Sequence, residues 1–290
     1  MSASMYNPAM SSPFDEKTLD ETPIVVLDTE TTGLHPGLGD RVVEIGGLRL
    51  EGGQEVAQFD RLIYPERPMN PEASAINRIY DADLAGQPTF RDIADEFEAF
   101  VDGAVLVAHN AVFDANFLGT EMFIAGRAQP ELREPALANP WICTLQLARR
   151  RFYFGRNNLG TIARRLQVRT GRAHRALADV YTTAAVLKAM AHQLAREQVQ
   201  TVGDLFHAQG GAVYAAPPPD IELPEPLAAA IMAQQLVNLL YVEGDSREVA
   251  VTPLYAMRHQ GVPYLIARLA ERDELRPFQL NFIFGVTPLT

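Results

Sequence analysis

The sequence predicts an α/β protein with a mixed β-sheet flanked by helices, followed by a small C-terminal β-rich module. Three observations lead to this fold class. Short apolar or β-branched runs alternate with segments of helical periodicity as far as residue 206. A proline-rich segment at residues 207–226 then interrupts the pattern, and its composition predicts a linker. Residues 227–290 return to strand-like runs separated by turns.

The elements of the first domain, expected at residues 23–206, follow in order along the chain. Residues 1–22 are polar and without periodicity, so we expect a disordered leader. Strands are expected where short apolar runs occur, at residues 24–27, 42–50, 56–63, 104–108 and 141–143. Helices are expected where the spacing is helical, at residues 72–79, 90–101, 113–125, 145–151, 159–166 and 175–195. In the module we expect a helix at 227–237 and strands at 239–243, 247–254, 262–269 and 276–284.

The composition sets limits on compartment and partners. Of the 290 residues, 47% are hydrophobic, enough to bury a sizeable core. Cys143 stands alone, which excludes an internal disulfide and favours a reducing, cytoplasmic location. The longest apolar runs are too short to span a membrane, and the leader lacks the apolar centre of a signal peptide. The net charge of −11 argues against a general nucleic-acid coat protein.

Two carboxylates stand at the end of the first predicted strand. Asp28 and Glu30 are two residues apart, so their side chains point to the same side of the strand. Taken alone, this pair is typical of a solvated strand end. A second acid, Asp114, follows His109 and Asn110 where the fourth strand leads into a helix. Asn110 as a helix cap and Asp114 as a first-turn charge would explain that motif equally well.

A third motif pairs His174 with Asp179 near the start of the last long helix. Five residues correspond to about 140° around a helix, so the two side chains share a face only if His174 lies in the preceding loop. The alternative is a surface histidine beside a helix-start acid. Four carboxylates that converge would repel one another, and divalent cations with oxygen ligands relieve that repulsion. Two Mg²⁺ or Mn²⁺ ions suit phosphodiester hydrolysis, with histidine as general base.

This set of residues resembles the DEDDh 3′–5′ exonucleases, the DnaQ-like family, over residues 22–196. The stretch Asp-Thr-Glu-Thr-Thr-Gly-Leu at 28–34 is close to the first family motif, and the histidine-to-aspartate spacing marks the histidine subclass. The resemblance implies a ribonuclease H-like fold and two-metal release of nucleoside 5′-monophosphates from a 3′ end. It implies that Asp28, Glu30 and Asp179 hold one metal, that Asp28 also touches the second and that Asp114 acts through water. His174 is then the base.

The resemblance also implies a substrate and partners. Residues expected to line the terminal nucleotide or support the site are Thr29, Thr31, Leu34, His109 and Asn110. We expect single-stranded DNA as substrate in proofreading or repair, with RNA 3′-end trimming as the alternative. A DNA polymerase or sliding clamp is a possible partner, since residues 200–206 resemble a clamp-binding peptide. The ordinary interpretation of that segment is a short amphipathic helix. Further alternatives are a subunit active only in a polymerase complex and a nucleic-acid-binding regulator.

Positive charge is concentrated between residues 141 and 180, where nine arginines accompany a single acid, Asp179. The tract could guide a phosphate backbone, although a solvated helical face explains Arg164 and Arg165 as well. Phe152, Tyr153 and Phe154 lie among these arginines and could stack on bases or join the core.

The C-terminal module resembles a WYL domain, on the stretches at 239–254, 261–267 and 275–283. The resemblance implies a small SH3-like or Sm-like barrel that binds nucleic acid or a nucleotide. The namesake triplet is Pro263-Tyr264-Leu265, without tryptophan, and Asn281 and Phe282 replace the usual acid and arginine. These departures leave Arg247, Arg258 and Arg276 as the remaining groups that could bind such a ligand. The alternative is an unrelated barrel used for dimerisation or polymerase contact.

Overall fold

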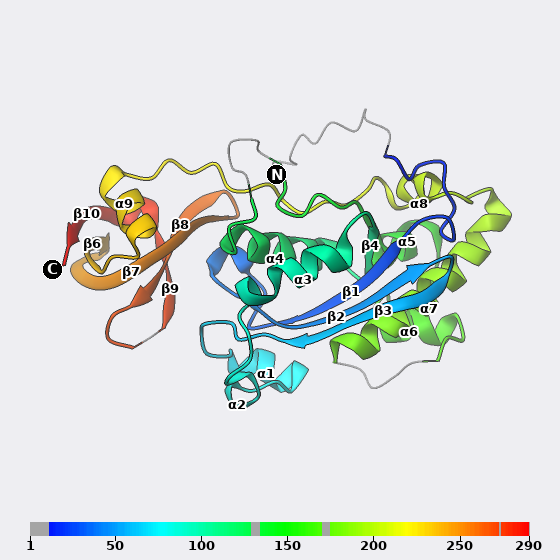
Figure 1. The fold of residues 1–290 in the computed structure, drawn as a ribbon, viewed down its shortest axis with the longest axis horizontal. Coiled ribbons are helices and arrows are strands. Elements are labelled where there is room, and N and C mark those ends of the chain that lie inside the picture. Colours follow the sequence, from blue (N-terminus) through cyan, green and yellow to red (C-terminus); the bar gives the residue numbers. More distant parts are fainter. Residues whose placement is uncertain (1–11, 129–133, 170–174, 273, 290) are drawn as a thin grey trace.

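The computed structural model describes residues 12–128, 134–169, 175–272 and 274–289, and two sheets lie side by side in it (Figure 1). The larger sheet has the strand order β3-β2-β1-β4-β5. Its strands are β1 (Ile24–Thr31), β2 (Val42–Glu51), β3 (Gln54–Leu62), β4 (Val105–Ala108) and β5 (Trp141–Cys143). The first three strands pair antiparallel, whereas β4 and β5 run parallel to β1. The expected mixed sheet is confirmed.

The apolar start of β1 is buried on both faces of the sheet. Val25 and Leu27 pack on one face and Ile24 and Val26 on the other. Such a continuous apolar run is typical of a strand covered on both sides. The helices that cover the first face are α3 (Phe90–Val101) and α4 (Ala111–Ile124). The helices that cover the second are α5 (Thr144–Arg151), α6 (Leu159–Arg165), α7 (Ala176–Leu194) and α8 (Val202–Gln209).

Short helices complete this domain at its edges. They are α1 (Pro71–Asn77), α2 (Asp81–Leu84), and the 3-10 turns η1 (Pro36–Leu38) and η3 (Ala195–Glu197). The described part of the leader, residues 12–22, lies against α8, because the Val202 and Gly203 amides donate to the carbonyls of Lys17 and Asp15. The segment that resembles a clamp-binding peptide belongs to α8. Its Leu205 and Phe206 side chains are buried in the core, so they are not presented to a partner.

The second domain is the C-terminal module, with the strand order β10-β6-β7-β8-β9, all antiparallel. Its elements are α9 (Glu225–Ala233), β6 (Val237–Glu243), β7 (Asp245–His259), β8 (Val262–Leu269), β9 (Leu275–Gln279), η4 (Leu280–Phe282) and β10 (Ile283–Pro288). The single strand expected at 276–284 is wrong. The η4 turn divides it because β9 pairs with β8 at one edge of the sheet, whereas β10 pairs with β6 at the other.

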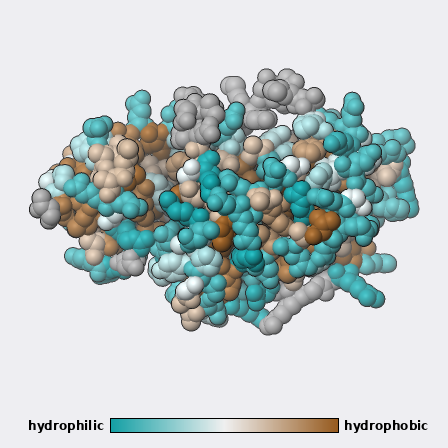
Figure 2. All heavy atoms as spheres, in the orientation of Figure 1, coloured by the Kyte–Doolittle hydropathy of each residue, from teal (hydrophilic) through white to brown (hydrophobic). Residues whose placement is uncertain are grey.

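The surfaces of the two domains differ in character. Hydrophilic side chains cover most of the larger domain in Figure 2, and apolar side chains are more frequent over the module at the left. The exposed apolar side chains of the module include Met232 and Phe284. Among the helices of the described residues, none is long and apolar enough to cross a membrane.

Candidate active site

The first two carboxylates lie where β1 leaves the core. Asp28 and Glu30 are partly exposed, whereas the four residues that precede Asp28 are buried. Asp28 pairs across the sheet with Gly46 and Glu30 pairs with Glu44, so both acids belong to a strand held from its β2 side. The alternation along β1 directs the two carboxylates to one side of the strand.

Asp179 joins this pair from the first turn of α7. One carboxylate oxygen from each of Asp28, Glu30 and Asp179 lies within 4.8 Å of the others. The close approach of α7 depends on Gly46 of β2. A Cβ atom there would stand 2.5 Å from the Ala176 carbonyl carbon and from the Leu177 nitrogen. Glycine at this position therefore allows the beginning of α7 to lie directly on β2, which places Asp179 beside β1.

Asp114 is connected to the same site through β1. Its carboxylate, which is 2% exposed, accepts hydrogen bonds from the Thr29 backbone N–H at 3.1 Å and the Thr29 hydroxyl at 2.8 Å. Asn110, with φ of 75°, turns the chain from β4 into α4 in the left-handed conformation that asparagine tolerates. Asn110 stands at the N-cap position of α4, as the capping explanation expects, and its backbone carbonyl accepts from the Phe113 N–H, but its side chain caps none of the described N–H groups of the helix.

The acids raise one another's pKa. Burial is the largest cause that raises the pKa of Asp28 well above its usual value, and repulsion by Asp114, Glu30 and Asp179 adds to it. Burial raises the pKa of Glu30 to about 7, with further repulsion from Glu44. Burial likewise raises the pKa of Asp114 to about 7, against the lowering effect of its hydrogen bonds from Thr29. The cluster therefore favours protonation unless a cation lies among its oxygens.

Glu44 is a further acid of this site that sequence reasoning missed. It is buried, with its side chain 1% exposed, and it forms an ion pair with Arg175 at 2.6 Å. It also accepts a hydrogen bond from the Ala176 N–H, the first residue of α7, at 3.1 Å. Glu44 thus holds the beginning of α7 against β2, next to Glu30. The available signal was an acid within the apolar run that forms β2.

The residues expected to line the terminal nucleotide take different places. Thr29 is engaged with Asp114, and the Thr31 hydroxyl donates to the Gly33 carbonyl at 2.6 Å. Leu34 is 70% exposed in the loop that follows β1. His174 lies outside the described residues.

His109 lies away from the carboxylate cluster. Its Nδ1 atom is 2.9 Å from the Thr144 hydroxyl, and its Nε2 atom is 3.0 Å from the Asn157 carbonyl oxygen. Burial, the largest effect on this ring, lowers the pKa of His109, which favours the neutral form. His109 therefore connects the end of β4 to α5 and to the following loop.

Some arginines of the basic tract form ion pairs within the protein, so fewer of them are available to bind phosphate than the composition indicates. Arg151 pairs with Glu197 at 2.5 Å, and Arg175 is held by Glu44. Arg164 and Arg165 are exposed on α6, and Arg172 lies outside the described residues. Phe152 and Phe154 stack on each other, with ring centroids 5.1 Å apart, and pack against the core, whereas Tyr153 is fully exposed.

The donor set fits a hard divalent cation. All its members are carboxylates, which are the ligands that Mg²⁺ and Mn²⁺ prefer, and three of their oxygens are close enough to reach one ion. Burial first, and then repulsion among the acids, raises the pKa of Asp28 and of Glu30, so a bound cation would stabilise their ionised forms.

Comparison with known families agrees with this geometry. A family model described as Exonuclease matches residues 25–187, and a WYL domain model matches residues 222–288. A DNA polymerase III subunit epsilon of Rickettsia felis is 39% identical over 165 residues, which are 56% of this chain and 71% of that protein. An epsilon-like protein of Rhodobacter capsulatus is 42% identical over 114 residues, or 39% of this chain. The chain spans only 16% of that relative's length and 12% of that of a Thermotoga maritima PolC-type polymerase.

Solved structures give the same result. Exonuclease X, in a complex with 5′ overhanging duplex DNA, is 31% identical with a TM-score of 0.50, covering 64% of this chain and 99% of that one. E. coli Exonuclease I in complex with a dT13 oligonucleotide is 15% identical with a TM-score of 0.53. The match covers 92% of this chain and 66% of the Exonuclease I chain. At that identity, the second likeness shows the fold alone.

Proposed function

The chain belongs to the exonuclease family and carries a 3′–5′ exonuclease domain of the DEDDh type, and we propose that it shortens single-stranded DNA from the 3′ end. The observation that supports this most directly is the convergence of Asp28, Glu30 and Asp179 within 4.8 Å at the end of β1. The names of its relatives, which are polymerase III epsilon subunits, favour DNA and a role in proofreading or repair.

We assign Asp28, Glu30 and Asp179 to one divalent cation, and Asp28 with Asp114 to a second, either Mg²⁺ or Mn²⁺. Two such ions, when bound, lower the pKa of the attacking water and neutralise charge on the leaving oxygen. The protein holds the acids ready for this task. Thr29 orients Asp114 through two hydrogen bonds, and the beginning of α7 keeps Asp179 beside β1.

We assign the general base to His174, which would take the proton of the attacking water. The assignment rests on the resemblance to the histidine subclass of the DEDDh exonucleases, which the spacing of His174 and Asp179 marks. The site is contained in this one chain, so we expect hydrolysis without a polymerase, although a polymerase partner would bring the enzyme to primer ends.

The test is degradation of 5′-labelled single-stranded DNA and RNA of the same sequence, in Mn²⁺, Mg²⁺ or EDTA. We expect stepwise shortening from the 3′ end that requires metal and is faster on DNA. His174→Ala should lower the rate at least a hundredfold, in the range that general base catalysis contributes. His192→Ala, which removes an exposed histidine of α7, is the matched control and should keep the wild-type rate.

Several results would contradict the proposal. Shortening from the 5′ end, activity in EDTA or equal rates for His174→Ala and His192→Ala would each be incompatible with it. Faster hydrolysis of RNA would move the function to RNA 3′-end trimming. Loss of all hydrolysis with retained DNA binding would instead indicate a binding protein or a subunit that needs its polymerase.

A further inference from the structure

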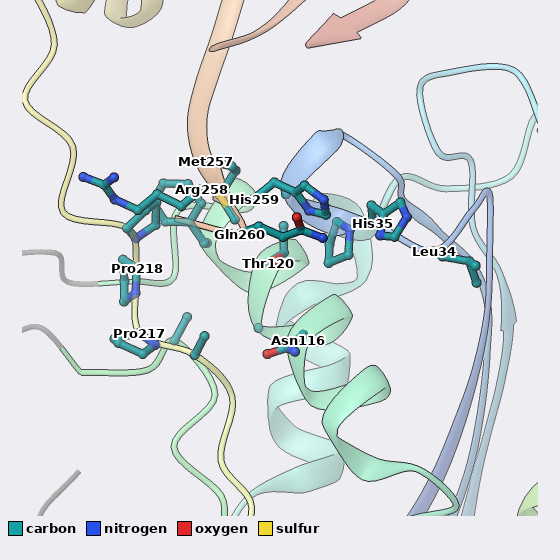
Figure 3. Close-up of a pocket in the computed structure, with 17 residues that line it drawn as sticks. Leu34, His35, Asn116, Thr120, Pro217, Pro218, Met257, Arg258, His259 and Gln260 are labelled. Atoms are coloured by element: carbon teal, nitrogen blue, oxygen red, sulfur yellow. The ribbon is translucent and has the colours of Figure 1, made fainter. Parts of the chain in front are cut away.

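A cavity of about 330 Å³ lies where the larger domain meets the module (Figure 3). Its walls come from three parts of the chain that are distant in sequence. They are the loop after β1, one face of α4 and the end of β7, and the linker after α8 closes one side. The lining residues on which the argument mainly depends are Leu34, His35, Arg258, His259 and Gln260, with Asn116 and Thr120 of α4.

This cavity shares two elements with the carboxylate site. Leu34 follows Glu30 by four residues, in the loop that continues β1. Helix α4 carries Asp114 toward β1 and, about half a turn away, Asn116 and Thr120 toward the cavity. In Figure 3, Leu34 lies at the end of the cavity beside the blue strands, and the Arg258 side chain lies at the opposite end. The cavity therefore extends from the loop that continues the carboxylate-bearing strand β1 toward the module.

The chemistry of the walls suits a nucleotide. Among the described residues that line the cavity none is acidic, although the whole chain carries a net charge of −11. Arg258 donates to the carbonyls of Gly261 and Asp220, both at 3.0 Å, and these uncharged acceptors orient the guanidinium without cancelling its charge. The remaining polar side chains of the lining are the amides of Asn116 and Gln260, the Thr120 hydroxyl, and the imidazoles of His35 and His259. The Arg258 guanidinium can bind a phosphate, and the neutral polar side chains of the lining can donate hydrogen bonds to a base and accept them from it.

A bound nucleotide also needs a surface that its base can contact, and the lining offers ring and apolar surfaces for this. The rings of His35 and His259 meet edge to face with centroids 4.9 Å apart. The exposed Leu34 side chain and the prolines at 217–219 add apolar surface elsewhere in the lining. Stacking on such surfaces is how single-stranded nucleic acids are held without regard to sequence.

The module is fitted closely onto the loop that carries Leu34. A Cβ atom on Gly37 would stand 2.5 Å from the Arg258 carbonyl oxygen, so η1 and the end of β7 are in backbone contact. A Cβ atom on Gly39 would lie 3.2 Å from the Ile266 side chain of β8. The position of Arg258 relative to Leu34 is thus set by direct packing between the two domains.

We propose that this cavity binds a nucleotide of the substrate strand on the 5′ side of the nucleotide being removed. The inference rests on the proposed function, since the 3′-terminal nucleotide must lie at the carboxylates for the strand to continue past Leu34. Arg258 of the module binds a phosphate of that strand, and the His35 and His259 rings contact its base. The WYL module is then part of the substrate groove.

The test compares a substrate that fills only the terminal position with one that also reaches the module. The first is the p-nitrophenyl ester of thymidine 5′-monophosphate, and the second is a 5′-labelled 12-nucleotide single-stranded DNA. The measured quantity is the ratio of kcat/KM on the DNA to kcat/KM on the ester. In Arg258→Ala this ratio should fall about tenfold, as expected for the loss of one charge-assisted phosphate contact. The fall should diminish as the ionic strength rises.

Two further variants make the test specific. Arg247→Ala removes a module arginine that lies over the Tyr241 ring, outside the cavity, and should keep the wild-type ratio. Gln260→Glu changes an exposed side chain to an acid of the same shape, so it preserves the fold and should lower the ratio as Arg258→Ala does. An unchanged ratio in both cavity variants would overturn the inference. Failure of the wild-type protein to hydrolyse either substrate would overturn the proposed function instead.

Discussion

Replacing Glu30 with glutamine should stabilise the metal-free protein at alkaline pH. The pKa of Glu30 is raised from 4.5 to about 7 by burial first and then by the repulsion of Glu44, Asp179 and Asp114. One pKa unit corresponds to about 1.4 kcal/mol, so the ionised carboxylate destabilises the folded state by roughly 3 kcal/mol above pH 7. The destabilisation is absent below about pH 4, where the folded and unfolded chains are both protonated, and it grows as the pH rises.

Urea unfolding in EDTA at two pH values measures this effect. At pH 8.5, Glu30→Gln should raise the free energy of unfolding by roughly 3 kcal/mol, and at pH 5.5 by only about 1 kcal/mol. Glu222→Gln, at an exposed glutamate of the linker, is the matched control and should change neither value. Added Mn²⁺ should raise the free energy of unfolding of the wild-type protein more than it raises that of the Glu30→Gln variant, because the variant lacks one of the three grouped carboxylates.

The change with pH in the stability gained by Glu30→Gln tests whether the removed charge is the cause. A variant that is no more stable than the wild type in EDTA at pH 8.5 would refute the reasoning that burial and repulsion store free energy at this site. An equal gain at both pH values would show that glutamine acts through packing rather than through the removal of charge.

Three further changes follow from particular contacts. Thr29→Val removes the hydroxyl that donates to Asp114 at 2.8 Å, so kcat/KM on single-stranded DNA should fall about tenfold, whereas Thr29→Ser should stay near the wild type in the same kinetics. Glu121→Ala removes the buried carboxylate that lies 2.7 Å from the Arg41 guanidinium, and Arg41 keeps only Glu66, at 3.1 Å, as an ion-pair partner. Urea unfolding should show a loss of about 3 kcal/mol. Gly46→Ala should raise the Mn²⁺ concentration for half-maximal activity about tenfold, because its Cβ would displace the beginning of α7, and an unchanged Mn²⁺ titration would contradict this.

The parts of the fold and site that local pattern encodes could be predicted from the sequence. The apolar run of β1 and the alternation that places Asp28 and Glu30 together both appear within a few residues. The site also depends on contacts between distant segments, such as Glu44 with Arg175, which are 131 residues apart. Strand register brings Glu44 opposite Glu30, and no local pattern specifies that register.

The arginines of the chain are a second case in which the sequence pattern does not specify contacts between distant segments, and here those contacts bear on substrate binding. Counting residues located the basic region between residues 141 and 180, yet two of its arginines are held in ion pairs by Glu197 and Glu44. Arg258 lies outside that tract, in the C-terminal module. The fold places it at the end of an acid-free cavity that begins at Leu34. A phosphate responds to local field rather than to net charge, so an acidic chain can hold a polyanion at this one junction.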